Sequence, residues 1–80
     1  MKEDFIKKYW DEEDILFYIH FQDDEAVRQI EVKSDEKVYL TLEEPIKGES
    51  MLYDQKLSEL DLEKSDFIRE EEFNQVWKKV

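Results

Sequence analysis

The feature that most constrains this chain is a run of seven residues, 15–21, that is largely apolar on both sides. Its sequence, Ile-Leu-Phe-Tyr-Ile-His-Phe, is rich in β-branched and aromatic residues and predicts a β-strand. Alternate side chains of a strand point to opposite faces. One face would carry Ile15, Phe17, Ile19 and Phe21, and the other Leu16, Tyr18 and His20. We therefore expect this strand in the middle of a sheet, with a further layer covering each face.

Three other segments have the character of strands. Residues 38–42 alternate between apolar and polar side chains. Residues 26–33 also alternate, and one side carries Ala26, Arg28, Ile30 and Val32. Short polar turns at 22–25 and 34–36 favour antiparallel hairpins. Residues 5–10 fit one face of a helix as well as a strand, and a strand gives the simpler topology because it starts a meander.

The last twelve residues predict a short amphipathic helix, from about 69 to 79. Apolar residues recur at the i, i+3, i+4, i+7 spacing of one helical face, at Phe73, Val76, Trp77 and Val80. Three glutamates in the first turn and two lysines in the last turn match the helix dipole. We expect this helix to pack on one face of the sheet through Phe73, Val76 and Trp77. Both tryptophans, Trp10 and Trp77, are expected in the core.

The segment between the sheet and the helix is irregular but rich in apolar residues. Pro45 and Gly48, each the only residue of its type, end the last strand at about Glu43. The apolar residues of this segment are Ile46, Met51, Leu52, Tyr53, Leu57, Leu60 and Leu62. Such a content favours a stretch packed across the sheet. The second sheet face is then covered either by residues 46–62 or by another molecule, which includes a second copy of the chain.

Together these elements predict one small α+β domain that spans residues 1–80. Its sheet is a four-stranded antiparallel meander with strands at about 4–10, 14–22, 26–33 and 37–43. One C-terminal helix packs on one face of the meander.

The charge of the chain limits its partners. It has 23 acidic and 12 basic residues, so its net charge is −11. A surface of this kind repels nucleic acid and anionic lipid, and it suits solubility or a basic protein partner. The longest apolar run is too short to span a membrane, and the first residues do not fit a signal peptide. We expect a cytoplasmic protein that binds neither nucleic acid nor membranes.

The sequence contains none of the usual constellations of catalytic or metal-binding residues. Cysteine is absent and histidine occurs once, so a transition-metal site would need carboxylates as its other ligands. The acidic turns at 11–14 and 23–25 lack the spaced ligands and central glycine of a calcium loop. One glycine also excludes a glycine-rich phosphate loop. We predict no catalytic residue, no metal and no cofactor, and hence no enzyme.

The candidate interaction or pocket residues are Tyr18, His20, Arg28 and Tyr39. Arg28 stands out because it shares a predicted strand face with Ile30 and Val32. A charge on a core face must reach the edge of the sheet or pair with a carboxylate. We expect Glu43 or a glutamate of the helix to be that partner.

Three motifs in this order resemble an uncharacterised family of short acidic bacterial proteins. They are Phe-Ile-Lys-Lys-Tyr-Trp at 5–10, Val-Arg-Gln-Ile-Glu-Val at 27–32 and Glu-Glu-Phe-Asn-Gln-Val-Trp at 71–77. The family has a first strand that ends in Trp, a V-R-x-V-E strand motif and a C-terminal E-E-F-x-x-V-W helix. It usually has Gly in the turn at 34–37 and Ser or Thr at the position of Arg69. The resemblance implies a strand at 5–10, and some members look like immunity-type proteins.

These observations favour a non-enzymatic protein-interaction module of bacterial or phage origin, with an immunity or inhibitor role as its concrete form. The partner would bind the acidic surface, or an aromatic sheet face that the chain leaves uncovered. The alternative is a small ligand-binding or regulatory domain. Its pocket would lie between helix and sheet and converge on His20 and Arg28.

Overall fold

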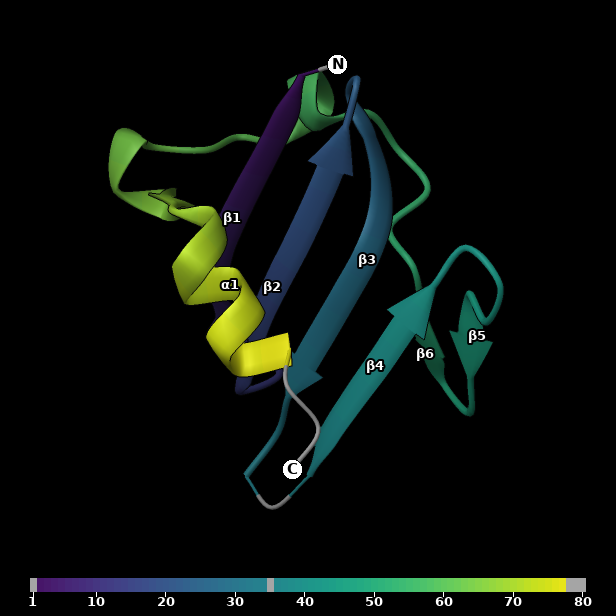
Figure 1. Cartoon of the computed structure of the whole chain (residues 1–80). Coiled ribbons are helices and arrows are strands. Elements are labelled where there is room, and N and C mark those ends of the chain that lie inside the picture. Colours follow the sequence, from purple (N-terminus) through teal and green to yellow (C-terminus); the bar gives the residue numbers. More distant parts are fainter. Residues whose placement is uncertain (1, 35, 78–80) are drawn as a thin grey trace.

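Four strands follow one another in an antiparallel meander (Figure 1). They are β1 (Glu3–Trp10), β2 (Ile15–Gln22), β3 (Glu25–Val32) and β4 (Lys37–Thr41). This computed structural model describes residues 2–34 and 36–77, so Asp35, in the predicted turn at 34–36, lies outside the described residues. The α+β class, the antiparallel sheet and the single C-terminal helix are confirmed.

Two strand bounds depend on turn chemistry. β2 and β3 are joined by Asp23 and Asp24, whose φ angles of 49° and 76° are the positive values that a tight hairpin turn requires. β4 ends at Thr41, two residues before the predicted end. There, the Thr41 amide donates to the Glu44 carbonyl oxygen at 3.2 Å, and the Glu44 amide donates to the Thr41 hydroxyl at 3.0 Å. This turn removes Leu42 from the ladder.

The sheet has a fifth strand that the sequence did not indicate. β7 (Phe67–Ile68) pairs antiparallel with Phe5 and Ile6 of β1, so the strand order is β4-β3-β2-β1-β7. β7 is two residues long, and a pattern this short cannot be told from a loop. A separate hairpin, β5 (Ile46–Lys47) and β6 (Ser50–Met51), turns at Gly48 with φ +59°.

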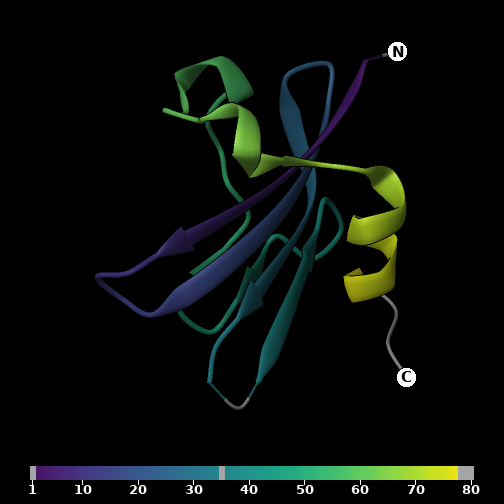
Figure 2. The same ribbon diagram turned by 90° about the vertical axis from the view of Figure 1, so that its left-hand side faces the viewer.

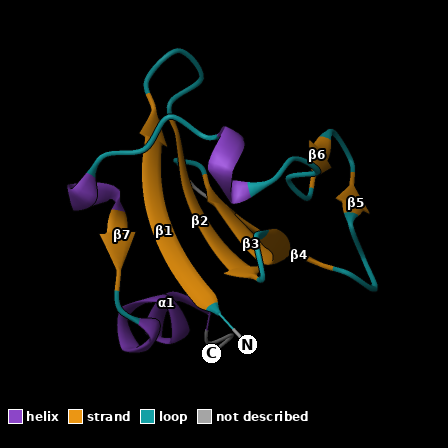
Figure 3. Cartoon of the chain, turned by 90° about the horizontal axis from the view of Figure 1, so that it is seen from above, coloured by secondary structure: helices purple, strands orange, loops and turns teal. Residues whose placement is uncertain are grey.

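The central position of β2 is confirmed, and each of its faces meets a different covering layer. The helix α1 (Glu70–Trp77) lies on one side of the sheet and the segment 46–62, here called the strap, lies on the other (Figures 2 and 3). The helix-side core is Phe5, Tyr18, Ile30 and Phe73. The strap-side core is Ile6, Ile19, Phe21, Ala26, Leu40, Leu52 and Leu57.

Ala26 was predicted on the same face of β3 as Arg28 and Ile30, but it lies on the opposite face. The pairing of β2 with β3 shifts by one residue, so that His20 pairs with Arg28 and Phe21 with Ala26. Val27 is the extra residue of this irregularity, which inverts the alternation beyond it. Ala26 therefore packs in the strap-side core, whereas Arg28 and Ile30 face the helix. The sequence pattern alone could not show this insertion.

The helix packs as predicted through its apolar face. Phe73 is fully buried, and Val76 and Trp77 are half-buried against the same cluster. The amide of Phe73 donates to the carbonyl oxygen of Arg69 at 3.1 Å, so the first helical turn closes on Arg69. The predicted continuation of the helix to 79, and Val80 on its apolar face, lie outside the described residues.

The prediction of a core position for Trp10 was wrong. Its side chain is 51% exposed, and it makes a tilted contact with Phe17 at a ring separation of 6.1 Å. Trp10 is the last residue of β1, on the strap side of the sheet. The strap covers Ile6 and Ile19 but leaves this end of the strand open.

Two substitutions test this assignment of layers. Phe73→Ala removes a fully buried ring and should cost about 3–5 kcal/mol, which is comparable to the whole stability of a domain this size. Trp10→Ala should cost less than about 1 kcal/mol, because half of its ring is already in water. Urea unfolding followed by circular dichroism measures both. Equal losses for the two variants would contradict the assignment.

Candidate functional site

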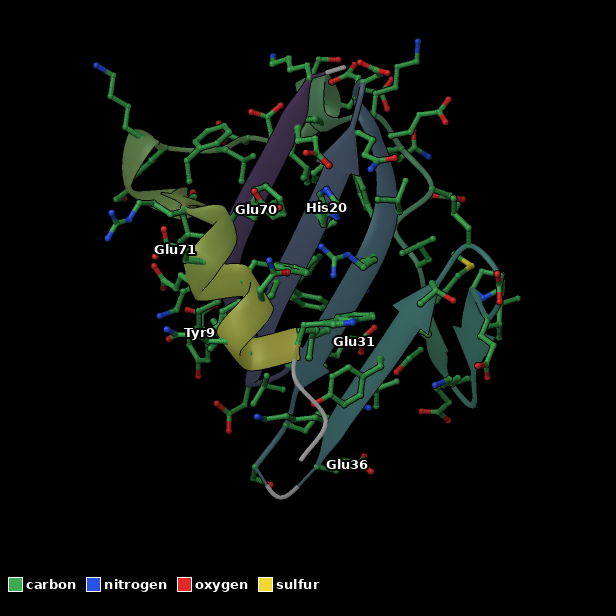
Figure 4. The ribbon with its side chains drawn as sticks, viewed as in Figure 1. Tyr9, His20, Glu31, Glu36, Glu70 and Glu71 are labelled. Atoms are coloured by element: carbon green, nitrogen blue, oxygen red, sulfur yellow. The ribbon has the colours of Figure 1, made fainter. Side chains whose placement is uncertain are left out.

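The structure brings His20 and Arg28 into direct contact on the helix side of the sheet. His20 is 4% exposed, and its Nδ1 accepts a hydrogen bond of 2.9 Å from Nε of Arg28. Its Nε2 lies 3.0 Å from Oε1 of Glu3. Arg28 also donates from Nη2 to Oδ1 of Asn74 on the helix, at 3.3 Å. In Figure 4, His20 lies on the central strand, level with Glu70 at the start of α1.

These bonds determine the protonation state of His20. The guanidinium of Arg28 can only donate, so Nδ1 of His20 must be the unprotonated acceptor. The proton then sits on Nε2 and is donated to Glu3. Burial lowers the pKa of His20 below its ordinary 6.5; the Glu3 hydrogen bond opposes this shift, and the Arg28 charge adds to it. The histidine is therefore a neutral bridge between a carboxylate and a guanidinium.

The charge of Arg28 is held by aromatic rings and neutral acceptors. Its guanidinium carbon lies 4.8 Å from the ring centre of Phe73 and 5.1 Å from that of Trp77. Among the described residues no carboxylate forms an ion pair with it, so the predicted pairing with Glu43 or a helix glutamate was wrong. Burial lowers the pKa of Arg28, and the nearby charges of Glu70 and Glu3 oppose that shift. Cation–π contacts replace the expected salt bridge.

The two tyrosines of the candidate set lie on the same face. Tyr18 is buried, with Nζ of Lys7 5.7 Å from its ring centre. Tyr39 meets Trp77 edge to face at a ring separation of 5.3 Å. The four candidates Tyr18, His20, Arg28 and Tyr39 therefore share one face. Phe73 and Trp77 of the helix pack in the same cluster as the two tyrosines.

Polar residues on the other face of β3 hold the strap. Gln29, 2% exposed, donates to the carbonyl oxygen of Met51 at 3.1 Å and accepts from the amide of Tyr53 at 2.7 Å. Glu31, 5% exposed, accepts from Nε2 of Gln29 at 3.1 Å and from the hydroxyl of Ser50 at 3.0 Å. At its other end the strap bonds to Asp24, whose carbonyl accepts from the Leu57 amide at 3.0 Å.

The strap leaves two apolar grooves on its side of the sheet. The Trp10 groove, of about 220 Å³, is lined chiefly by Ile6, Trp10, Phe17, Met51, Tyr53 and Leu60. The Ile46 groove, of about 320 Å³, is lined chiefly by Ala26, Leu42, Pro45, Ile46, Met51 and Tyr53. Residues 51–54 line both grooves, so the two are adjacent. Together they form the candidate site.

The sequence did not indicate that these groove residues are exposed. Trp10 was expected in the core, Leu42 on the apolar side of the last strand, and Ile46 and Met51 in a segment packed across the sheet. Two local signals were available: Trp10 directly precedes an acidic turn, and Leu42 and Ile46 lie within three residues of Pro45. Exposure itself depends on the path of the strap, which has no periodic pattern.

The comparisons with known proteins give no relative: the chain matches no family model, no curated protein and no solved structure. The resemblance of the three motifs to a bacterial family stays a prediction. Within residues 2–34 and 36–77, no group of three or more acidic or histidine side chains is placed to hold a metal ion. In the same ranges, the structure has no helix with the length and apolar character that a membrane crossing requires.

The His20 bridge predicts an acid-sensitive fold. Because the folded state lowers the pKa of His20, the unfolded chain binds more protons below the ordinary value of 6.5. The contribution of neutral His20 is fully present above that pH and is lost as the pH falls below it. Urea midpoints between pH 7.5 and 5 should decrease for the natural chain and change less for His20→Gln. Equal slopes for both would contradict the neutral bridge.

Gln29→Leu tests the attachment of the strap. The variant leaves the Tyr53 amide and the Met51 carbonyl without their partner, which should cost about 1–3 kcal/mol. Each kcal/mol lowers the Tm of a domain this size by about 4–8 °C. Gln55→Leu, at an exposed position, is the matched control and should change Tm little. A Tm for Gln29→Leu equal to that of the control would show that the strap is held otherwise.

Proposed function

We propose that this protein is a non-enzymatic protein-interaction module that docks its partner on the strap side of the sheet. One observation carries the proposal: large apolar side chains remain exposed around the two grooves. Trp10 is 51% exposed, Met51 52%, Ile46 64% and Leu42 66%. Contiguous exposed apolar surface rimmed by polar residues is typical of protein interfaces.

Two surfaces are candidates for binding the partner, an aromatic patch and the acidic surface. The position of the strap bears on the choice between them. The strap buries most of the apolar strap-side face, so a wholly uncovered sheet face is not available. It leaves an open surface at the Trp10 end and at the Ile46 end. Aromatic and methionine side chains are enriched at interface centres, and Trp10 and Met51 are of these types. The proposal therefore places the energetic centre at these grooves and leaves the surrounding charge to steer association.

The helix side of the sheet supports a ligand pocket or an enzyme less strongly than the strap side supports a protein interface. Phe73 and Trp77 lie against Arg28, and His20 is bonded on both of its ring nitrogens. A general base or a ligand-binding group must be open to its substrate. An immunity or inhibitor role remains the concrete version of the proposal. It is supported by the motif resemblance and by an interface that needs no catalytic group.

A photo-crosslinking experiment tests the proposed function. A benzophenone amino acid placed at Trp10 should give one or a few defined protein adducts in cells that naturally make the protein. The same group at Glu71, an exposed position on the helix, is the matched control and should give few. Adducts are read by gel shift and mass spectrometry. Equal or absent adducts at the two positions would contradict docking at the grooves.

A further inference from the structure

The two grooves form one continuous surface on either side of residues 51–54. The Trp10 groove reaches β1 and β2, and the Ile46 groove reaches the start of β3 and the segment after β4. Tyr53 lines both. A linear segment of another protein that crosses Tyr53 would place apolar side chains in both grooves.

The rim of this surface carries unpaired negative charge. Glu25 lines the Ile46 groove and Asp54 lines both grooves, and neither carboxylate has an ion-pair partner among the described residues. Among the described residues, Lys8 is the one cation that lines either groove. Its Nζ lies 3.5 Å from Oδ2 of Asp66 and donates to the Asp61 carbonyl oxygen at 3.3 Å. Lys8 therefore already has an ion-pair partner within the fold.

The environment of Tyr53 agrees with this negative rim. Its pKa is raised, first by burial and then by the charges of Glu59 and Asp54. The apolar lining of the two grooves and the carboxylates at their rim together determine the chemistry of a complementary ligand. Such a ligand has apolar side chains that fill the grooves. It also has a cation that faces Asp54, which lines both grooves, and Glu25, which lines the Ile46 groove.

We propose that the Trp10 and Ile46 grooves together bind a cationic segment of a partner protein. Its apolar side chains fill the grooves on either side of Tyr53, and a lysine or arginine faces Asp54 and Glu25. This inference rests on the proposed function and specifies the partner of that same surface. The net charge of −11 opposes a second copy of the chain as the occupant, since two such surfaces repel each other. It favours a basic partner for the same reason.

A random-peptide display library gives an unbiased test. Peptides are selected on the natural chain and counter-selected on Trp10→Ala, whose folding is checked by circular dichroism. We expect sequences that combine lysine or arginine with large apolar residues. Synthetic copies should bind Trp10→Ala and Ile46→Ser at least roughly tenfold more weakly, as for the central residues of an interface. Neutral or acidic consensus sequences would overturn the proposal.

Charge variants separate the rim from the general acidity of the chain. Asp54→Asn and Glu25→Gln should each weaken the selected peptides by roughly two- to fivefold, as for partly exposed ion pairs. Glu71→Gln removes the same charge at an exposed helix position and should change binding little. Equal losses for all three variants would show non-specific attraction and overturn the proposal. The proposal would also be overturned if sedimentation equilibrium showed a dimer and Trp10 were protected from fluorescence quenching in that dimer.

The two proposals fail in different ways. Position-specific adducts at Trp10, combined with neutral or acidic selected peptides, leave the interaction function standing and overturn only the cationic partner. Absence of any adduct that depends on position 10 removes the function itself.

Discussion

The fold depends on the burial of both faces of β2. Ile19 and Phe21 on one face and Tyr18 and His20 on the other are each less than 10% exposed. A fully buried large apolar side chain contributes about 1.5–3 kcal/mol, and an 80-residue domain has few of them. The chain therefore needs two covering layers, and its described residues form one short α-helix. An irregular strap takes the place of the second helix.

Adjacent residues of β3 attach the two layers. Arg28 points to the helix side and bonds to Asn74, while Gln29 points to the strap side and bonds to the backbone of Met51 and Tyr53. Each is a polar group in a largely apolar setting, so each is costly unless its bonds are made. Such groups favour one arrangement of each layer over others of similar apolar burial. The strap in particular has no repeating hydrogen-bond pattern of its own to fix its position.

The sequence predicted the helix and the strands whose apolar side chains recur at a regular spacing. The strand pattern of 15–21 and the helical spacing of Phe73, Val76 and Trp77 follow from side-chain geometry alone. Side-chain geometry alone does not predict the strand β7, the irregularity at Val27 or the exposure of Trp10. Each depends on contacts between distant segments: β7 on a partner in β1, Val27 on the register with β2, and Trp10 on where the strap crosses. His20 and Arg28 were candidate residues of the sequence, but their hydrogen bond to each other could not be predicted because it depends on the β2–β3 register.

The path of the strap also determines where the proposed interface lies. A strap held at Gln29 and Asp24 has a fixed path, and a fixed path leaves a fixed part of the sheet uncovered. The open grooves are therefore a consequence of how the second face is closed. Binding there can be strong without movement of the fold, because the strap and sheet are already joined by hydrogen bonds.

Amide hydrogen exchange measures the central claim most directly. If the strap is a true second layer, the amides of Tyr53 and Leu57 are protected, since they donate to Gln29 and Asp24. Their protection should be well above that of an unstructured chain and should approach that of the β2 amides. Gln29→Leu should remove protection at Tyr53 first. Exchange of Tyr53 and Leu57 at the rate of a free chain, beside a protected β2, would show that the strap is not a second layer.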